Sequence, residues 1–237
     1  MGSRGKAPGL ALRNDWFSSL LGTWACPRLR AMYLGVTPAC RLSIAAGVWA
    51  RGVAALFGLK GLRRSKRQER AGFELYSAAV TAARDPWFYQ ALGVPDTLDG
   101  RFDLVALHAF LLIDRLQSAP APGPDLAQAV FDAMFSDMDN NLREIGVSDL
   151  SVGKRIRAMW EAFHGRAKVY AAALEAADHV ALETALARNV WRGAAPQGAA
   201  ASLSQCVFAQ SHHLAAQPLA ILASGHAQFL SALEASR

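Results

Sequence analysis

Apolar residues recur every three or four positions through most of residues 69–237, and few stretches alternate with period two. This spacing is typical of helices that bury one face. The first predicted helix covers Phe73–Ala83 and ends at Asp85-Pro86, because proline cannot continue a helix. The aromatic cluster Trp87 to Tyr89 follows, and we expect it to pack under the next element.

Two longer helices are predicted next. A turn-rich segment ends with Asp99, a residue suited to cap a helix over Arg101–Gln117. A proline-rich loop at 120–124 leads to a helix over Asp125–Ile145, which Gly146 ends. The apolar positions expected to face other helices are Phe102, Val105, Ala109, Leu112 and Leu116 in the first, and Phe131, Phe135 (or Met134), Met138 and Leu142 in the second.

The last third of the chain is also predicted to be helical. Ser148 and Asp149 open a long helix whose apolar positions run from Val152 to Leu174, and Asp178 caps another that ends near Gly193. A loop at 194–201 precedes one or two helices over 202–235, which are bent or broken at Pro218. The fold class is therefore all-α: a single helical bundle domain of about six to seven helices.

Charge divides the chain into a basic arm, residues 1–68, and a helical domain, residues 69–237. The domain holds 13 of the 25 Lys and Arg residues but 18 of the 19 acidic residues, so the net charge of +6 comes from the arm. A basic arm on an acidic body indicates a membrane surface, an acidic partner or a targeting address. The arm lacks the pattern of a secretory signal. Its composition resembles that of a mitochondrial transit segment. Alternatively, translation starts at Met32, and the residues before Met32 are upstream sequence.

The segment 42–59 is the membrane candidate of the arm. It is short for a span, and Arg51 at its centre would cost about 2.5–3.5 kcal/mol on insertion scales. Its apolar residues recur at helical spacing, so an amphipathic helix in the membrane interface is one interpretation; a packed or frayed helix and a true span are the others. The residues expected at a membrane surface are Trp49, Arg51, Leu56, Arg63, Arg64, Lys66 and Arg67.

The densest polar run covers residues 132–144. It resembles the start of a calcium loop at Asp137, but the glycine and glutamate that such a loop needs at its sixth and twelfth positions are absent. On a helix, Asp132 and Asp139 share one face, and Arg143 follows Asp139 at ion-pair spacing. A structural or partner-facing helix is therefore favoured over a metal site.

Other candidate chemistry is sparse. Glu161 and His164 form one Glu-x-x-His pair, whereas di-iron bundles use two. His108 is expected to be partly buried and hydrogen-bonded. The three cysteines form no CxxC pair, which fits a reducing compartment, and no nucleophile elbow, phosphate loop or dinucleotide fingerprint occurs. The sequence therefore predicts a protein that is not an enzyme and has no cofactor or metal.

Three motifs in order resemble the ubiquinol–cytochrome c chaperone family. They are GVPDTLDGRFD from Gly93, MFSDMDNNLREIGVSDLSVGK from Met134 and FHGR from Phe163, within the similar stretches Phe88–Leu116 and Ala127–Tyr170. A weaker resemblance covers Ala181–Val190. The matching residues are Asp96, Asp99, Arg101, Phe102, Asp103, Asp137, Asp139, Arg143, Glu144, Gly146, Lys154, Gly165 and Arg166.

The resemblance implies a helical assembly chaperone for the cytochrome bc1 complex. Such a protein binds newly made cytochrome b, or another bc1 subunit, and holds it until haem and partner subunits are in place. In mitochondrial members it implies a small helper protein and a position near the ribosome exit. The expected location is cytoplasmic and peripheral to the inner membrane in a bacterium, or the matrix side of the mitochondrial inner membrane.

Residues expected to contact a partner are Asp132, Asp137, Asp139, Arg143, Glu144, Arg101, Asp103 and Lys154. An acidic helix face suits the basic cytoplasmic loops of a membrane subunit. The main alternative is a haem- or quinone-binding helical bundle at the membrane surface. A membrane-peripheral protein of an unrelated pathway is another. Nucleic acid is not expected as a partner beyond ribosome contact.

Overall fold

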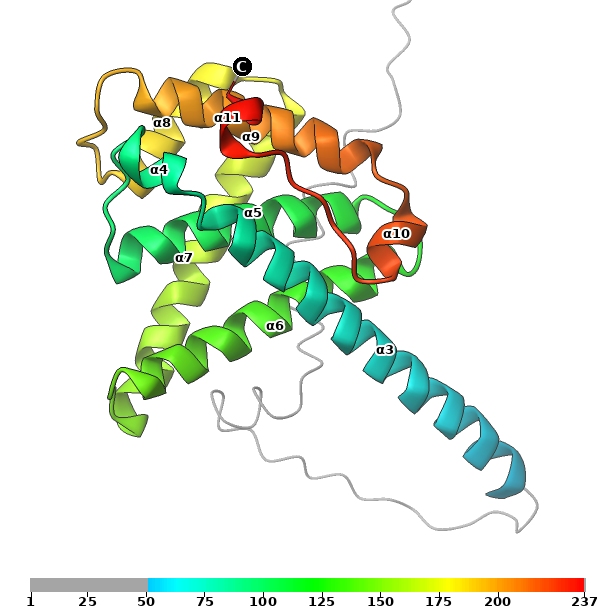
Figure 1. Cartoon of the computed structure of the whole chain (residues 1–237). Coiled ribbons are helices and arrows are strands. Elements are labelled where there is room, and N and C mark those ends of the chain that lie inside the picture. The colour runs from blue at the N-terminus through cyan, green and yellow to red at the C-terminus, as the bar shows by residue number, and fades with distance from the viewer. Residues whose placement is uncertain (1–50, 237) are drawn as a thin grey trace, which may run out of the picture. The chain divides into compact units, whose positions relative to one another are not determined.

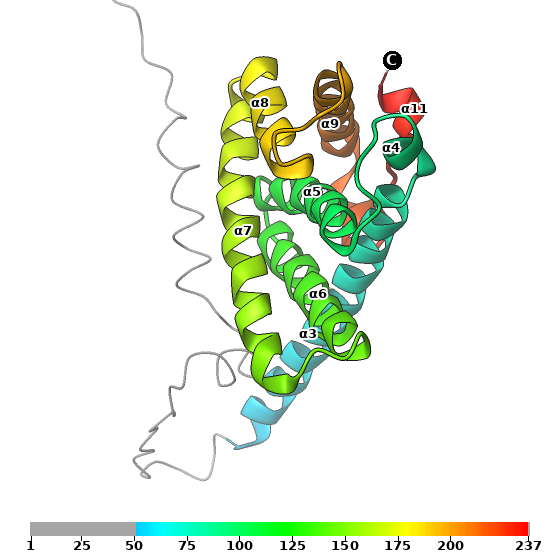
Figure 2. The ribbon, with the colours of Figure 1, turned by 90° about the vertical axis from the view of Figure 1, so that its left-hand side faces the viewer.

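The structure, a computed structural model, describes the backbone of residues 51–236 and the side chains of residues 66–236, all within one unit of the chain, Gly47–Arg237. Over these residues the all-α prediction is confirmed (Figures 1 and 2). The long helices are α3 (Arg51–Ala83), α5 (Leu98–Gln117), α6 (Gly123–Glu144), α7 (Asp149–Glu175), α8 (His179–Val190) and α9 (Ala199–Ala216). The short ones are α4 (Pro86–Gln90), α10 (Leu219–Ala223) and α11 (Ala232–Ala235).

Helix α5 forms the centre of the bundle. Every residue from Asp103 to Ile113 is buried, because α3, α6, α7, α8 and α9 all pack against this helix (Figure 2). A helix that is apolar around its whole circumference is buried on all sides. The predicted seam is confirmed at four positions that are buried, while Phe102 is partly exposed. The four are Val105, Ala109, Leu112 and Leu116.

Helix α3 is longer than the predicted helix over Phe73–Ala83. It starts at Arg51, and its first half projects beyond the other helices, whereas its second half packs against α5 and α6 (Figure 1). The boundary expected at residue 68 therefore falls inside a continuous helix. Residues 42–50 of the amphipathic candidate lie outside the described residues. None of the described helices has an apolar stretch long enough to cross a membrane.

The helix ends show which local signals were decisive. Thr97, and not Asp99, is the N-cap of α5: its hydroxyl accepts a hydrogen bond from the Gly100 amide at 3.2 Å. Asp99 lies in the first turn, where a negative charge is favourable near the helix N-terminus. The caps at Asp178 and the break at Pro218 are confirmed. Gly146 has φ +83°, the left-handed conformation that ends α6.

His108 of α5 is fully enclosed. Its ring lies against those of Phe88 and Phe229, with centroids 5.4 and 5.5 Å away, and Nδ1 lies 2.8 Å from the carbonyl oxygen of Leu104. Burial lowers the pKa of His108 from 6.5 to about 4, against a smaller opposing effect of the Leu104 hydrogen bond. The imidazole is therefore neutral at physiological pH. The sequence predicted a partly buried, hydrogen-bonded histidine, and the structure shows that His108 is fully buried.

Lowering the pH from 7.5 to 5 should reduce the free energy of unfolding by about 2 kcal/mol through His108 alone. The unfolded chain binds a proton near pH 6.5, whereas the folded one does so only near pH 4, so stability is lost as the pH falls through that window. Urea unfolding of the wild type and His108→Gln at both pH values measures this, because glutamine keeps a donor without titrating. An equal loss in both proteins would contradict the assignment.

Candidate functional site

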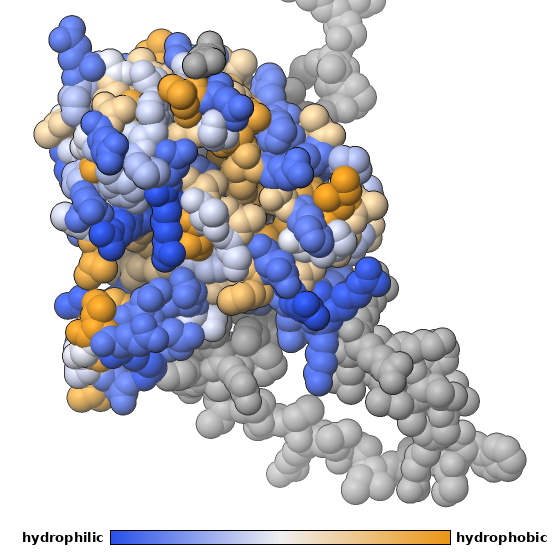
Figure 3. Space-filling model, in the orientation of Figure 1, coloured by the Kyte–Doolittle hydropathy of each residue, from blue (hydrophilic) through white to orange (hydrophobic). Residues whose placement is uncertain are grey.

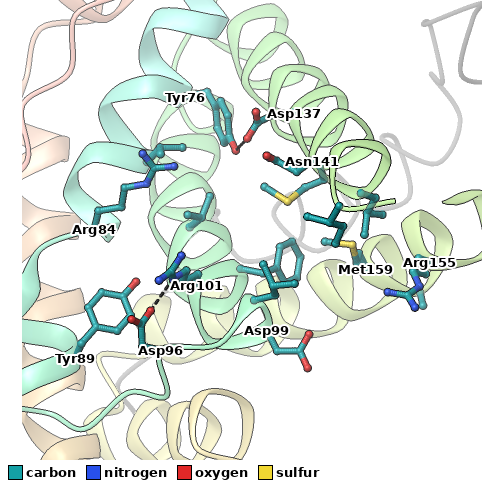
Figure 4. A pocket seen from close by; sticks show the side chains of 18 of the residues that line it. Tyr76, Arg84, Tyr89, Asp96, Asp99, Arg101, Asp137, Asn141, Arg155 and Met159 are labelled. Carbon is teal, nitrogen blue, oxygen red and sulfur yellow. Dashed lines mark hydrogen bonds and ion pairs between the residues drawn. The ribbon is translucent and has the colours of Figure 1, made fainter. Parts of the chain in front are cut away.

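An open groove of about 840 Å³ lies among α3, α4, α5, α6 and α7 (Figure 4). Each of the four long helices contributes residues at helical spacing, so that one face of each helix turns toward the groove. On α3 these are Tyr76 and Val80, four residues apart, and Arg84 follows directly after the end of the helix. On α6 they are Asp137, Met138, Asn141 and Leu142, and on α7 they are Arg155, Ala158 and Met159.

The floor of the groove is apolar. We define this floor by six apolar lining residues that are buried or partly buried: Val80, Phe102, Val105, Met138, Leu142 and Met159. Two further apolar side chains at its edges, Leu98 and Ile145, are 65% and 52% exposed. Figure 3 shows apolar surface in the hollow on the left of the molecule, between polar side chains above and below. An apolar surface with a polar rim is typical of an interaction site.

Polar side chains that line the groove are held by hydrogen bonds within the chain. The hydroxyl of Tyr76 donates to Asp137 Oδ2 at 2.7 Å, joining α3 to α6. Burial, together with this carboxylate, raises the pKa of Tyr76 far above its ordinary value, so the phenol stays protonated. Arg101 Nε lies 2.6 Å from Asp96 Oδ1, and this exposed pair closes the turn before α5. The Arg101 hydrogen bond lowers the pKa of Asp96.

A buried ion cluster lies behind the groove. Asp103, which is 4% exposed, pairs with Arg166 of α7 through Oδ1 and with Arg192 after α8 through Oδ2 at 2.7 Å. Burial raises the pKa of Asp103, and the two guanidinium groups oppose this effect. The cluster thus joins the central helix to α7, the helix that contributes Met159 to the floor of the groove. Its role is to hold helices together, because Asp103 has almost no exposed surface for a partner.

Comparison with known proteins decides the family. The sequence model of a family described as ubiquinol-cytochrome C chaperone matches residues 90–229, more than half of the chain. The chain belongs to this family. The crystal structure of the Cbp3 homolog from Brucella abortus is 34% identical, with a TM-score of 0.67, and the match covers 77% of this chain and 98% of that one.

A relative from Xenopus laevis, ubiquinol-cytochrome-c reductase complex assembly factor 1, is 22% identical over 120 residues. Those residues are 51% of this chain and 60% of the relative, so the chain spans less than two thirds of that protein's length. The resemblance seen in the three motifs is thereby confirmed. The ubiquinol–cytochrome c chaperone fold in this chain is the helical bundle described above.

The structure brings the chaperone motifs together. Five of the matching residues line the groove although they come from two motifs: Asp96, Asp99, Arg101, Phe102 and Asp137. The first and third motifs also meet directly, since Asp103 and Arg166 form an ion pair across 63 positions of sequence. Periodicity alone did not predict this convergence, because it indicates which helix face is buried but not which helix covers it.

The acidic run on α6 does not present all its carboxylates to solvent. Asp132 is partly buried and accepts a hydrogen bond from Gln128 at 2.8 Å, and burial raises its pKa. Arg143 bridges Asp139, at 2.7 Å, and Asp149 at the start of α7. The Asp139–Arg143 pair confirms the predicted ion-pair spacing. Of the remaining predicted contacts, Glu144 and Lys154 are exposed.

Several groove residues were not singled out from the sequence. Met138 and Met159 were placed only on apolar helix faces, Tyr89 only in the aromatic cluster and Asn141 only inside the second motif. No local signal distinguishes Tyr76, Arg84 and Arg155 from ordinary surface. Arg192 was missed for the same reason, since its partner Asp103 is 89 positions away.

The membrane-surface residues fall mostly beyond the described side chains. Trp49 lies outside the described residues, and Lys66 and Arg67 are exposed on α3. The other four, Arg51, Leu56, Arg63 and Arg64, lie in the first half of α3, whose side chains are not described.

Possible metal or redox chemistry has little support in the described part of the chain. No three His, Cys, Asp or Glu side chains between residues 66 and 236 come close enough together to hold a metal ion. His164 Nδ1 lies 2.9 Å from the Trp160 carbonyl oxygen, and the ring packs on Trp160 and Phe131. Cys206 is buried, and burial raises the pKa of its thiol to about 12, so it is unreactive.

Proposed function

We propose that this member of the chaperone family acts without catalysis in the assembly of ubiquinol–cytochrome c reductase, the cytochrome bc1 complex. It binds newly made cytochrome b and holds it while haem is inserted and partner subunits join. The observation that carries the proposal is the convergence of motif residues on an open groove with an apolar floor. Family membership supports the assembly role, and the groove supplies a surface on which a client can be held.

The chemistry of the groove suits a membrane subunit that is not yet assembled. Such a client exposes apolar helices that aggregate in water. Leu98 and Ile145 at the edges, with Met138 and Met159 on the floor, offer an apolar surface to cover them. Methionine side chains adapt their shape to different apolar partners. The exposed charges around the groove fix orientation more than they add affinity.

We further propose that basic side chains in and before the first half of α3 draw the protein to an anionic membrane surface. The exposed Lys66 and Arg67 on the described part of α3 support this. The location would be cytoplasmic and peripheral to the bacterial inner membrane, or the matrix side of the mitochondrial one. A small helper protein and contact near the ribosome exit are further partners in this proposal.

Affinity capture of the full chain from native membranes tests the client directly. Cytochrome b should dominate the bc1 subunits recovered, and deletion of the gene should lower the bc1 signal in difference spectra of membranes. Recovery of no bc1 subunit, together with an unchanged bc1 spectrum in the deletion strain, would overturn the proposal.

Charge reversal at Glu144 should lower cytochrome b capture by up to about fivefold, the size of effect expected for one exposed charge at an interface. Glu144 is the clean probe of the acidic run, because Asp137 and Asp139 hold Tyr76 and Arg143, and reversing them would disturb the fold. Glu175→Lys, an exposed glutamate at the far end of α7, is the matched control. Equal capture by both variants would remove Glu144 from the contact surface.

A further inference from the structure

We propose, resting on the chaperone function above, that the groove binds its client as a preformed amphipathic helix. The helix would lay an apolar stripe on the floor and carry acidic side chains at its flanks, where they meet Arg84 and Arg155. This specifies the conformation and the charge of the segment that is recognised, which membership of the family does not.

The walls of the groove favour a helical occupant. They are built almost entirely from helices, whose backbone N–H and C=O groups are already paired within each helix. An extended peptide would find no strand edge to pair with in this groove. Its own backbone groups would lose their hydrogen bonds to water over the apolar floor without gaining others. A helix satisfies its backbone internally, and it can therefore bury an apolar face there.

The shape and composition of the floor also favour an amphipathic helix as the occupant. Six apolar side chains from four helices form one surface, and it is bordered by Leu98 at the start of α5 and Ile145 after α6. Apolar side chains three and four residues apart on a bound helix would form a continuous apolar stripe that covers this floor. Met138 and Met159 allow the floor to accept more than one pattern of apolar side chains.

The charges at the rim indicate acidic flanks. Arg84 and Arg155 are exposed on opposite sides of the groove, and neither has an ion-pair partner among residues 66–236 (Figure 4). Arg101 is engaged by Asp96, and Asp137 accepts from Tyr76. The charges that remain unpaired at the rim are thus these two cations and the carboxylate of Asp99. A partner with carboxylates at its flanks is complementary to the two cations.

Binding of synthetic peptides to the full chain, followed by fluorescence anisotropy, tests the inference. The probe is an 18-residue peptide with leucine and alanine on one helical face and glutamate at the flanks. It should bind, and a scrambled peptide of the same composition should bind at least about tenfold more weakly because it cannot form the stripe. A version with lysine at the flanks should also lose about tenfold. Equal binding of the three peptides, or preference for lysine, would overturn the inference.

Two pairs of variants locate the binding. Ile145→Asp should weaken binding of the glutamate-flanked peptide about tenfold, whereas Val180→Asp, on α8 away from the groove and 73% exposed, should not. Arg155→Glu should weaken it, whereas Arg157→Glu, an exposed neighbour on α7 that does not line the groove, should leave it unchanged. Equal effects within each pair would place the peptide elsewhere, and binding of decylubiquinone or haem without peptide binding would also overturn the inference.

The two proposals fail in different ways. If wild-type protein captures cytochrome b from membranes and Ile145→Asp captures it equally well, the groove inference is wrong while the assembly function stands. If wild-type protein captures no bc1 subunit but still binds the peptide at the groove, the assembly function fails and the groove remains a helix-binding site for another client.

Discussion

Replacing Asp103 with alanine should lower the free energy of unfolding by about 3–5 kcal/mol, the cost of breaking a buried ion cluster by removing one partner. The carboxylate is 4% exposed and joins Arg166 of α7 and Arg192 after α8 to the central helix. Without it, the Arg166 guanidinium, whose side chain is only 19% exposed, stays in a largely dry site without its counter-charge. Urea unfolding followed by circular dichroism measures the loss.

Three variants separate the buried charge from general damage to the helix. Asp99→Ala removes an exposed aspartate one turn earlier in α5 and should change stability by no more than about 0.5 kcal/mol. Arg192→Ala should cost less than Asp103→Ala, because the Arg192 side chain is about half exposed. Adding Arg166→Met to Asp103→Ala should recover part of the loss, since no charge is then stranded. A loss at Asp103 no larger than that at Asp99 would contradict the structural role.

The same cluster shows why the burial of Asp103 could not be predicted from the sequence. Asp103 belongs to the GRFD motif and was expected to contact a partner, because a charged residue in a motif is more often exposed than buried. Its burial depends on Arg166 and Arg192, which lie 63 and 89 residues later. No local pattern pairs residues at such separations. The prediction found the motif residue, and only the tertiary structure gives its role.

Helices could be predicted well because their signals are local. The seam of α5, the cap at Asp178 and the break at Pro218 each depend on residues within two turns of one another. The errors at helix starts are also local: Thr97 competes with Asp99 as a cap, and its extended backbone conformation settles the choice. The short helix α4 was missed because five residues are too few to show a period. After Pro218 the predicted helical stretch contains two short helices, α10 and α11.

The groove could be predicted only in part. The first two family motifs contain ten of its lining residues, but the sequence did not show that they face one space together with Tyr76, Arg84 and Met159. Two polar contacts in the groove are made by motif residues, Arg101 with Asp96 and Asp137 with Tyr76. Much of what the motifs encode is therefore the frame of the groove, which leaves the apolar floor and the unpaired arginines as the surface for a client.

The close crossing of α3 and α6, which forms two walls of that frame, depends on Gly72. A Cβ atom at this buried position would lie 2.5 Å from Ala129 Cβ and 2.7 and 2.9 Å from the Ala129 carbonyl carbon and oxygen. Backbone atoms of α6 cannot move aside cheaply, so Gly72→Ala should lower the free energy of unfolding by about 3 kcal/mol despite the better helix propensity of alanine. Gly165→Ala on α7 is the matched control: nothing lies within 4 Å of the added atom, and stability should rise by about 0.5–1 kcal/mol. Urea unfolding of both variants measures these changes, and a gain of stability at Gly72 equal to that at Gly165 would show that α3 and α6 do not cross as closely as described.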